Sequence, residues 1–232
     1  MELGIYESVQ VLSSELHREL KVRPLIELDY AKPVTDTLLT VDEFFQAARS
    51  QPIVFAVGEN KKHFAAALLG LGRKRNWFVN EKKLWKTGEY MPAFLRRYPF
   101  VFVKGDDGTN YLGFDERCPA FNQEEGQRLF DDRGNPSKYA KTVLGFLQEY
   151  EAANERTAAF CAELERLELL ESITVQQWMG FPQPLLKGIK RVSERRLQKL
   201  PNEEVLSLVE KGYYKVIIAH LISLGHIERI AK

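Results

Sequence analysis

Residues 98–115 read YPFVFVKGDDGTNYLGFD, and this stretch decides the fold class. Aromatic and β-branched residues stand on both sides of a glycine- and aspartate-rich turn, which is the pattern of an antiparallel β-hairpin. In the first strand, Phe100 and Phe102 face one side and Val101 and Val103 face the other, because side chains alternate along a strand. We therefore expect the hairpin to be covered on both faces.

A long amphipathic helix is predicted after the hairpin. Between residues 139 and 171 apolar side chains recur at steps of three and four, which places them on one face of a helix; a break near Asn154 is left open. Before the hairpin, the continuous apolar run PIVFAV at 52–57 predicts a central strand. The segment FAAALLGL at 64–71 fits either a helix or a strand, and we favour the strand.

Shorter segments complete the predicted order of elements. Further strands are expected at 22–28, 76–79, 173–179 and 185–192. Further helices are expected at 40–50, 91–98, 193–200, 203–211 and 214–230. Pro24 places the first of these strands at a sheet edge. The last two strands are expected to form a second hairpin. Thr40 and Glu43 are expected to form a capping box at the start of the first helix. Since strands and helices do not alternate strictly, we predict an α+β fold with a central, largely antiparallel sheet, a long amphipathic helix and a C-terminal helical element.

Length and composition predict one globular domain. The chain has 232 residues, of which 44% are apolar and 28% charged, values close to those of ordinary soluble proteins. We expect a single domain over residues 1–232, with an edge element at 1–35 and a small helical subdomain at 193–232. The formal net charge of +1 excludes a bulk polyanion binder, so nucleic acid is not an expected partner.

The near-zero charge results from a cancellation along the chain. Residues 73–104 carry nine cations and two anions, whereas residues 105–135 carry eight acids and three arginines. A second basic segment follows at 187–199. The first segment has two interpretations. It is a basic, aromatic surface for a polyanion or an acidic partner, or its charges face the acidic segment or water while its aromatic residues fill the core. We favour the second, because charged blocks are usually solvated faces and strand aromatics usually pack.

Motifs of catalysis and cofactor binding are not found in the sequence. The four histidines are isolated, no glycine-rich phosphate loop is present, and no nucleophile elbow is present. We therefore expect no metal, no cofactor and no recognisable catalytic residue. Cys118 and Cys161 are expected to be buried, reduced thiols. No apolar run is long enough to span a bilayer and no signal peptide is visible, so we expect a cytoplasmic protein.

Three segments resemble a known family. They are WKTGEYMPAFLRRYPF at 85–100, LFDDRGNPS at 129–137 and HLISL at 220–224. In this order they resemble the SapC-like family, a bacterial family named for a protein associated with paracrystalline surface layers, and the resemblance covers residues 52–230. It implies a binding or assembly protein linked to surface-layer formation. It supplies no catalytic residues.

The first of these segments contains most of the candidate site. The candidate binding residues are Trp85, Tyr90, Arg96, Arg97, Tyr98 and Asp131. Pro92 predicts a helical turn that carries the two arginines, and their planar guanidinium groups suit carboxylates. The arginines have two interpretations: an internal clamp on the acidic turn at 129–135, or a site for a small anionic ligand or a protein partner.

Two functions from different classes follow from this sequence. The leading hypothesis is a non-enzymatic binding or assembly protein. The alternative is an enzyme, or an enzyme accessory subunit, with an anionic-substrate pocket around Trp85–Phe100. A concave polar pocket that joins these residues would favour the enzyme, whereas an exposed apolar patch would favour assembly.

Overall fold

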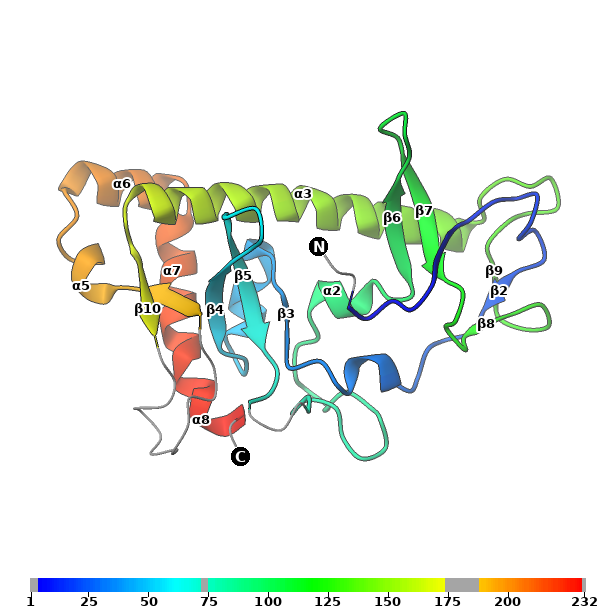
Figure 1. Ribbon diagram of the computed structural model, residues 1–232, viewed down its shortest axis with the longest axis horizontal. Helices are drawn as coiled ribbons and strands as arrows, with labels where there is room; N and C mark the ends of the chain where they lie inside the picture. Colours follow the sequence, from blue (N-terminus) through cyan, green and yellow to red (C-terminus); the bar gives the residue numbers. More distant parts are fainter. Residues whose placement is uncertain (1–3, 72–74, 174–187, 231–232) are drawn as a thin grey trace.

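The largest sheet of the protein has five antiparallel strands. The computed structural model describes residues 4–71, 75–173 and 188–230 (Figure 1). The strand order is β10-β11-β4-β5-β3, and every pair in it is antiparallel. The strands are β3 (Asp36–Leu38), β4 (Ile53–Val57), β5 (His63–Leu68), β10 (Leu170–Ile173) and β11 (Ile189–Val192). The strand interpretation of residues 64–71 is therefore confirmed for most of that segment.

The hairpin predicted at residues 98–115 forms. Strands β6 (Phe100–Lys104) and β7 (Asn110–Asp115) pair from Phe100 opposite Phe114 to Lys104 opposite Asn110. Strand β1 (Val9–Val11) adds to the other side of β7 and makes a three-stranded sheet. A third, small sheet has the order β8-β2-β9. Its strands are β8 (Phe121–Asn122), β2 (Lys21–Val22) and β9 (Gln127–Arg128).

One helix runs along most of the molecule. Helix α3 (Lys138–Arg166) passes over the five-stranded sheet with one half and over the β6–β7 hairpin with the other (Figure 1). The Ser137 side chain accepts a hydrogen bond from the Ala140 amide at 3.1 Å and caps its start. The helix is continuous through Asn154. It ends before residue 171, because the chain turns at Glu168 with a positive φ and enters β10.

The other helices of the described residues are short and gather mainly at the C-terminal end of the chain. They are η1 (Asp29–Ala31), η2 (Val41–Glu43), α1 (Phe44–Ala47), α2 (Ala93–Arg96), α5 (Glu194–Leu197), α6 (Asn202–Glu210), α7 (Tyr213–Ser223), η3 (Leu224–His226) and α8 (Ile227–Ile230). Helix α7 packs against α1 and against strands β4 and β11. Its buried residues Val216 and Ile217 lie in the same apolar core as Phe55 of the five-stranded sheet. Strands and helices together confirm the α+β prediction.

Two predicted strands, at 22–28 and 76–79, were wrong in extent or position. Strand β2 covers only Lys21–Val22, and Pro24, which has no amide hydrogen, follows it. The strand is not at an edge, because it lies between β8 and β9, the two sides of the 121–128 turn. Residues 76–79 form only an isolated bridge from Val79 to Trp85. Strand β11 pairs with β10 at residues 170–173. Of the strand predicted at 173–179, Ile173 lies in β10, and residues 174–179 lie outside the described residues.

In the part of the chain that the structure describes, no ion pair joins a cation of the basic segment 73–104 to an acid of the acidic segment 105–135. From the basic segment, Lys83 binds Glu27 and Asp29 at 2.9 Å. From the acidic segment, Asp132 binds Arg128 at 2.7 Å within the segment itself. These ion pairs are local or reach the N-terminal part of the chain. Both cysteines are buried and free, as predicted.

Candidate functional site

The segment 85–100 forms a loop that ends in helix α2. The Trp85 ring stacks on the buried Phe78 ring with 5.5 Å between centroids, and its indole N–H donates to the Glu89 carbonyl at 3.2 Å. Both interactions stay inside the loop between β5 and α2. The polar atom of Trp85 is therefore used to shape the loop.

Tyr90 and Arg96 form a hydrogen-bonded chain that ends on a buried carboxylate. The Arg96 guanidinium donates to the Tyr90 hydroxyl oxygen at 3.1 Å, and that hydroxyl donates to Glu43 Oε1 at 2.9 Å. The Ala93 amide at the start of α2 donates to the same oxygen at 2.6 Å. Burial and the Glu43 carboxylate raise the pKa of Tyr90 to about 12, so its hydroxyl stays a donor at neutral pH.

The other carboxylate oxygen of Glu43 binds a residue close to it in the sequence. Its Oε2 accepts hydrogen bonds from the Thr40 amide at 2.9 Å and from the Thr40 hydroxyl at 2.8 Å. The capping box predicted for Thr40 and Glu43 is therefore present. With only 6% of its surface exposed, Glu43 joins the segment before α1 to the start of α2.

Arg97 lies inside the protein among aromatic rings. It is 7% exposed, and its guanidinium carbon lies 4.3 Å from the Phe94 ring centroid, 5.1 Å from that of Tyr150 and 5.7 Å from that of Tyr6. These are cation–π distances. Within the described residues Arg97 forms no ion pair, and its Nε has no hydrogen-bond partner. Arg97 therefore serves as a buried packing residue in this structure.

Tyr98 contacts a second buried carboxylate. Its ring stacks on the Tyr30 ring with 4.1 Å between centroids, and its hydroxyl donates to Asp115 Oδ2 at 3.2 Å. Asp115 also accepts the amides of Glu7 and Ser8, at 2.9 and 3.0 Å, and thereby holds the N-terminal segment beside β7. Burial raises the pKa of the Tyr98 hydroxyl, with Cys118 and Asp115 adding to this effect.

Replacement of Tyr98 by Phe is expected to cost about 1 kcal/mol of unfolding free energy, because one buried hydrogen bond is lost while the stacked ring remains. Urea unfolding measures the change. The matched control is Tyr111→Phe, which removes a hydroxyl that donates to Asp107 at 3.2 Å on an exposed part of the hairpin. We expect no measurable effect there, and equal losses in both variants would contradict the assignment.

Asp131 does not join the other candidate residues. Its Oδ1 accepts the amides of Arg133 and Asn135 at 2.9 and 2.8 Å, so the carboxylate closes its own turn. These hydrogen bonds hold the pKa of Asp131 below its usual range. Arg128, rather than Arg96 or Arg97, forms the ion pair with the neighbouring Asp132. The proposed clamp between the two arginines and this turn is therefore wrong; the partners of the segment are Glu43 and Asp115.

The third family segment, residues 220–224, forms hydrogen bonds with two central strands of the five-stranded sheet. Strands β4 and β11 pair at Phe55 and Lys190, and in the same register Ile53 would face Val192. His220 lies there instead: its Nε2 accepts the Val192 amide at 3.0 Å, and its Nδ1–H donates to the Ile53 carbonyl at 2.9 Å. Two ladder hydrogen bonds are thus replaced by one imidazole.

Ser223 completes this junction. Its hydroxyl oxygen accepts the Ile53 amide at 2.9 Å and donates to the His220 carbonyl at 2.6 Å. Both residues are fully buried. Together they bind helix α7 to strands β4 and β11, which fixes the orientation of the opposite, exposed face of α7.

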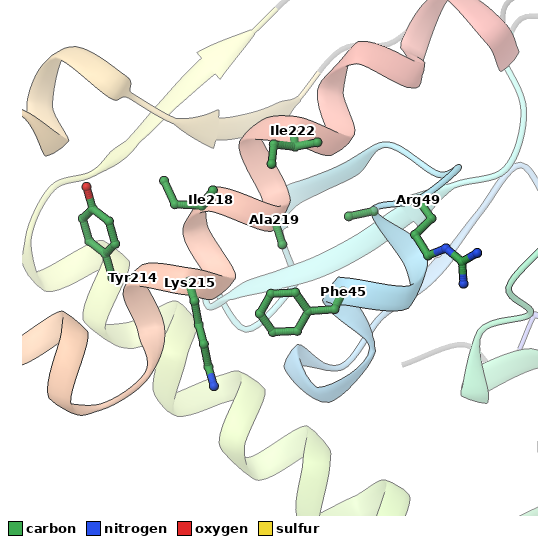
Figure 2. Close-up of a pocket in the computed structure, with 8 residues that line it drawn as sticks. Phe45, Arg49, Tyr214, Lys215, Ile218, Ala219 and Ile222 are labelled. Atoms are coloured by element: carbon green, nitrogen blue, oxygen red, sulfur yellow. The ribbon is translucent and has the colours of Figure 1, made fainter.

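A surface groove lies on that exposed face, between α1 and α7. Figure 2 shows Tyr214, Ile218 and Ile222 along one side of α7, with the Phe45 ring of α1 facing the helix. The groove has a volume of about 500 Å³. Phe45 is 48% exposed and Ile222 66% exposed, which is unusual for large apolar residues that share one patch.

Two cations also line the groove. They are Arg49, two residues after the end of α1, and Lys215 on α7 (Figure 2). Neither forms an ion pair with any residue in the described ranges. The groove is therefore apolar in its lining and positively charged at two of its lining residues.

The sequence prediction missed Glu43 as a partner, Asp115, His220 and the groove. Glu43 was recognised as a capping residue, but no spacing rule connects it to Tyr90, which lies 47 positions away. The groove has a weak signal in the sequence. Tyr214, Ile218 and Ile222 recur at steps of four in a segment that is apolar on all sides, so the exposed face could not be distinguished from the buried one.

Two classes of site are not found in the part of the chain that the structure describes. No group of three or more His, Cys, Asp or Glu side chains could hold a metal ion. No helix in the described ranges combines the length and the hydropathy needed to cross a lipid bilayer.

Comparison with known proteins gives one family. The family model described as SapC matches residues 12–230, which is nearly the whole chain. No curated protein and no solved structure matches the chain.

Proposed function

Because the chain belongs to the SapC family, we propose that it is a non-enzymatic binding protein whose α1–α7 groove holds an apolar segment of a protein partner. The single observation that carries this proposal is the exposure of Phe45, Ile218 and Ile222 around one groove. Contiguous exposed apolar side chains of this kind mark interaction sites on proteins. The partner's apolar side chains would fill the groove and release water from it.

The alternative of an anionic-substrate pocket at residues 85–100 has less support. The indole N–H of Trp85 and the hydroxyls of Tyr90 and Tyr98 already bind protein atoms. Arg97 is enclosed by aromatic rings. A substrate would have to displace these contacts, and several of them hold buried carboxylates in place.

The proposal extends to surface-layer assembly. The family is named for a protein associated with paracrystalline surface layers, and an assembly role requires binding to other proteins without a reaction. A groove for a protein segment is consistent with that role. The partner in this form of the proposal is a protein of the surface layer.

Affinity capture from the native cell tests the proposed site. Ile222→Asp removes an apolar side chain from the groove and is expected to lower the captured partner by about tenfold or more, because an apolar segment would have to strip water from the new carboxylate. The matched control is Ile26→Asp. Ile26 is 69% exposed, close to the 66% of Ile222, and does not line the groove. We expect the control to capture the partner normally.

A third variant separates the proposed site from the alternative. Arg96→Ala removes the exposed guanidinium of segment 85–100 and leaves the groove intact. If Arg96→Ala loses the partner and a folded Ile222→Asp protein retains it, the groove is the wrong site. Circular dichroism and the melting temperature establish that each variant is folded.

A further inference from the structure

We propose that the α1–α7 groove of one molecule binds helix α6 of a second copy of this chain, which joins copies head to tail. This inference rests on the proposed function, since it names an occupant for the same groove. It is carried by the chemistry of two separate surfaces of the chain. One is the groove, and the other is the outer face of α6.

Helix α6 exposes an apolar face. Leu206 and Val209 are 58% and 53% exposed, and at a spacing of three they lie on the same side of the helix. Leu208, on the opposite side, is fully buried and fixes α6 to the core. The exposed pair is therefore held in place by the fold and has no covering element among the described residues.

Acidic residues flank this apolar face. Glu203 lies three positions before Leu206, and Glu210 lies four positions after it, so both lie on the same side of the helix. Neither forms an ion pair within the described ranges, whereas the neighbouring Glu204 binds Arg166 at 2.6 Å. The outer face of α6 thus combines two exposed apolar side chains with two carboxylates that have no cationic partner there.

The groove has the complementary chemistry. Its apolar lining includes Phe45, Ile218 and Ile222, and its two charged lining residues, Arg49 and Lys215, are cations. An acidic amphipathic helix is a suitable ligand for a basic apolar groove, with the apolar side chains as anchors and the charges steering the encounter. Helix α6 fits this description with residues that are already exposed and helical.

The contact would be made between different copies. Leu206 and Val209 do not line the groove of their own chain, and α6 is packed against α7 through its other side. A helix of one copy in the groove of the next leaves one groove and one helix free at the two ends. Such a heterologous contact propagates as an open chain unless its rotation closes a ring.

We expect the association to be weak and sensitive to salt. A groove of about 500 Å³ accommodates only a few side chains, and small interfaces belong to transient complexes. Salt near 1 M shortens the Debye length to about 3 Å and would weaken the attraction between the glutamates and the two cations. The average mass in sedimentation experiments should therefore rise with protein concentration and fall with added salt.

A mixing experiment tests the head-to-tail geometry. Ile222→Asp blocks the groove, and Leu206→Asp blocks the helix; each variant alone is expected to sediment as a monomer. Mixed in equal amounts, they should form a one-to-one dimer, because the intact helix of the first variant meets the intact groove of the second. The dimer should grow no further. Ile26→Asp, the control, should associate as the unaltered protein does.

Three outcomes would overturn the inference. The unaltered protein could remain a monomer at every concentration, or the mixture of the two variants could remain monomeric. Loss of association in Ile222→Asp but not in Leu206→Asp would indicate a symmetric contact between grooves. Partner capture tests the proposed function separately. If Ile222→Asp loses the native partner while the unaltered protein stays monomeric, the binding function is supported and self-association is contradicted.

Discussion

Acidification from pH 6.5 to pH 4 is expected to lower the free energy of unfolding by about 3 kcal/mol through His220 alone. Burial lowers the pKa of this imidazole to about 4, whereas in the unfolded chain it returns to its ordinary value near 6.5. Between these two values the unfolded state binds more protons than the folded state. Acid therefore favours unfolding in this window, and the stabilisation is fully present above pH 6.5.

Geometry explains why protonation is unfavourable. Nε2 of His220 accepts the Val192 amide hydrogen, so a second proton on the ring would displace that hydrogen bond and place a charge in the core. The ring also lies 4.9 Å from the Phe55 ring, centroid to centroid, in a setting that cannot solvate the charge. Burial and the acceptor role of Nε2 therefore favour the neutral form, and they outweigh the hydrogen bond from Nδ1 to the Ile53 carbonyl, which acts in the opposite direction.

Urea unfolding at a series of pH values measures this effect. In His220→Gln the contribution of the imidazole to the pH dependence between 6.5 and 4 is expected to disappear, together with about 2 to 3 kcal/mol of stability at pH 7 from imperfectly satisfied strand groups. The control His17→Gln leaves His220 in place and should retain the loss on acidification. An unchanged pH profile in His220→Gln would contradict the assignment.

Local patterns predicted most of the elements, and contacts distant in sequence account for the errors. Alternating aromatic and β-branched residues suffice for the hairpin at 98–115, and the three-four spacing suffices for α3. The small sheet around Val22 depends on a turn about 100 residues further along the chain, between 121 and 128. No local pattern could reveal that pairing, whereas Pro24 suggested an edge position for the strand that became β2.

The candidate site was predicted in part for the same reason. The segment 85–100 was recognised as distinctive, but its partners Glu43 and Asp115 lie outside it and were not identified. Charge complementarity suggested the acidic turn at 129–135, whereas that turn is satisfied by its own amides. Charge in the sequence did not identify what the two arginines contact: Arg96 donates to the Tyr90 hydroxyl, and Arg97 packs among aromatic rings.

The family segments and the groove are connected through the helices they anchor. His220 binds one face of α7, and Ile222, two positions later, projects from the other face into the groove. Glu43 binds the start of α2, and Phe45, two positions later, forms the opposite wall. The distinctive residues therefore hold the groove walls in position, and they need not contact a ligand themselves.

Glu43→Ala is expected to destabilise the protein by about 3 to 5 kcal/mol, a large part of the stability of an ordinary domain. Four donors point at this buried carboxylate: the Thr40 amide and hydroxyl, the Tyr90 hydroxyl and the Ala93 amide. Alanine would leave them without an acceptor and would leave a cavity. The stability of Glu43→Gln should lie between that of the unaltered protein and that of Glu43→Ala. The amide oxygen of glutamine can accept hydrogen bonds from only some of the four donors, and its NH2 group would face the others.

Denaturant unfolding of these variants, with Glu59→Ala as the control, tests the assignment. Glu59 is an exposed glutamate whose side chain makes no hydrogen bond or ion pair within the described residues, so its removal should change stability by less than about 0.5 kcal/mol. Partner capture is a second measurement for Glu43, because this residue lies directly before α1, which carries Phe45. In Glu43→Gln, which we expect to remain folded, partner capture should fall although every groove residue is unchanged, because the wall that carries Phe45 is no longer anchored. Equal stability of Glu43→Ala and Glu59→Ala would show that the carboxylate does not hold these two segments together.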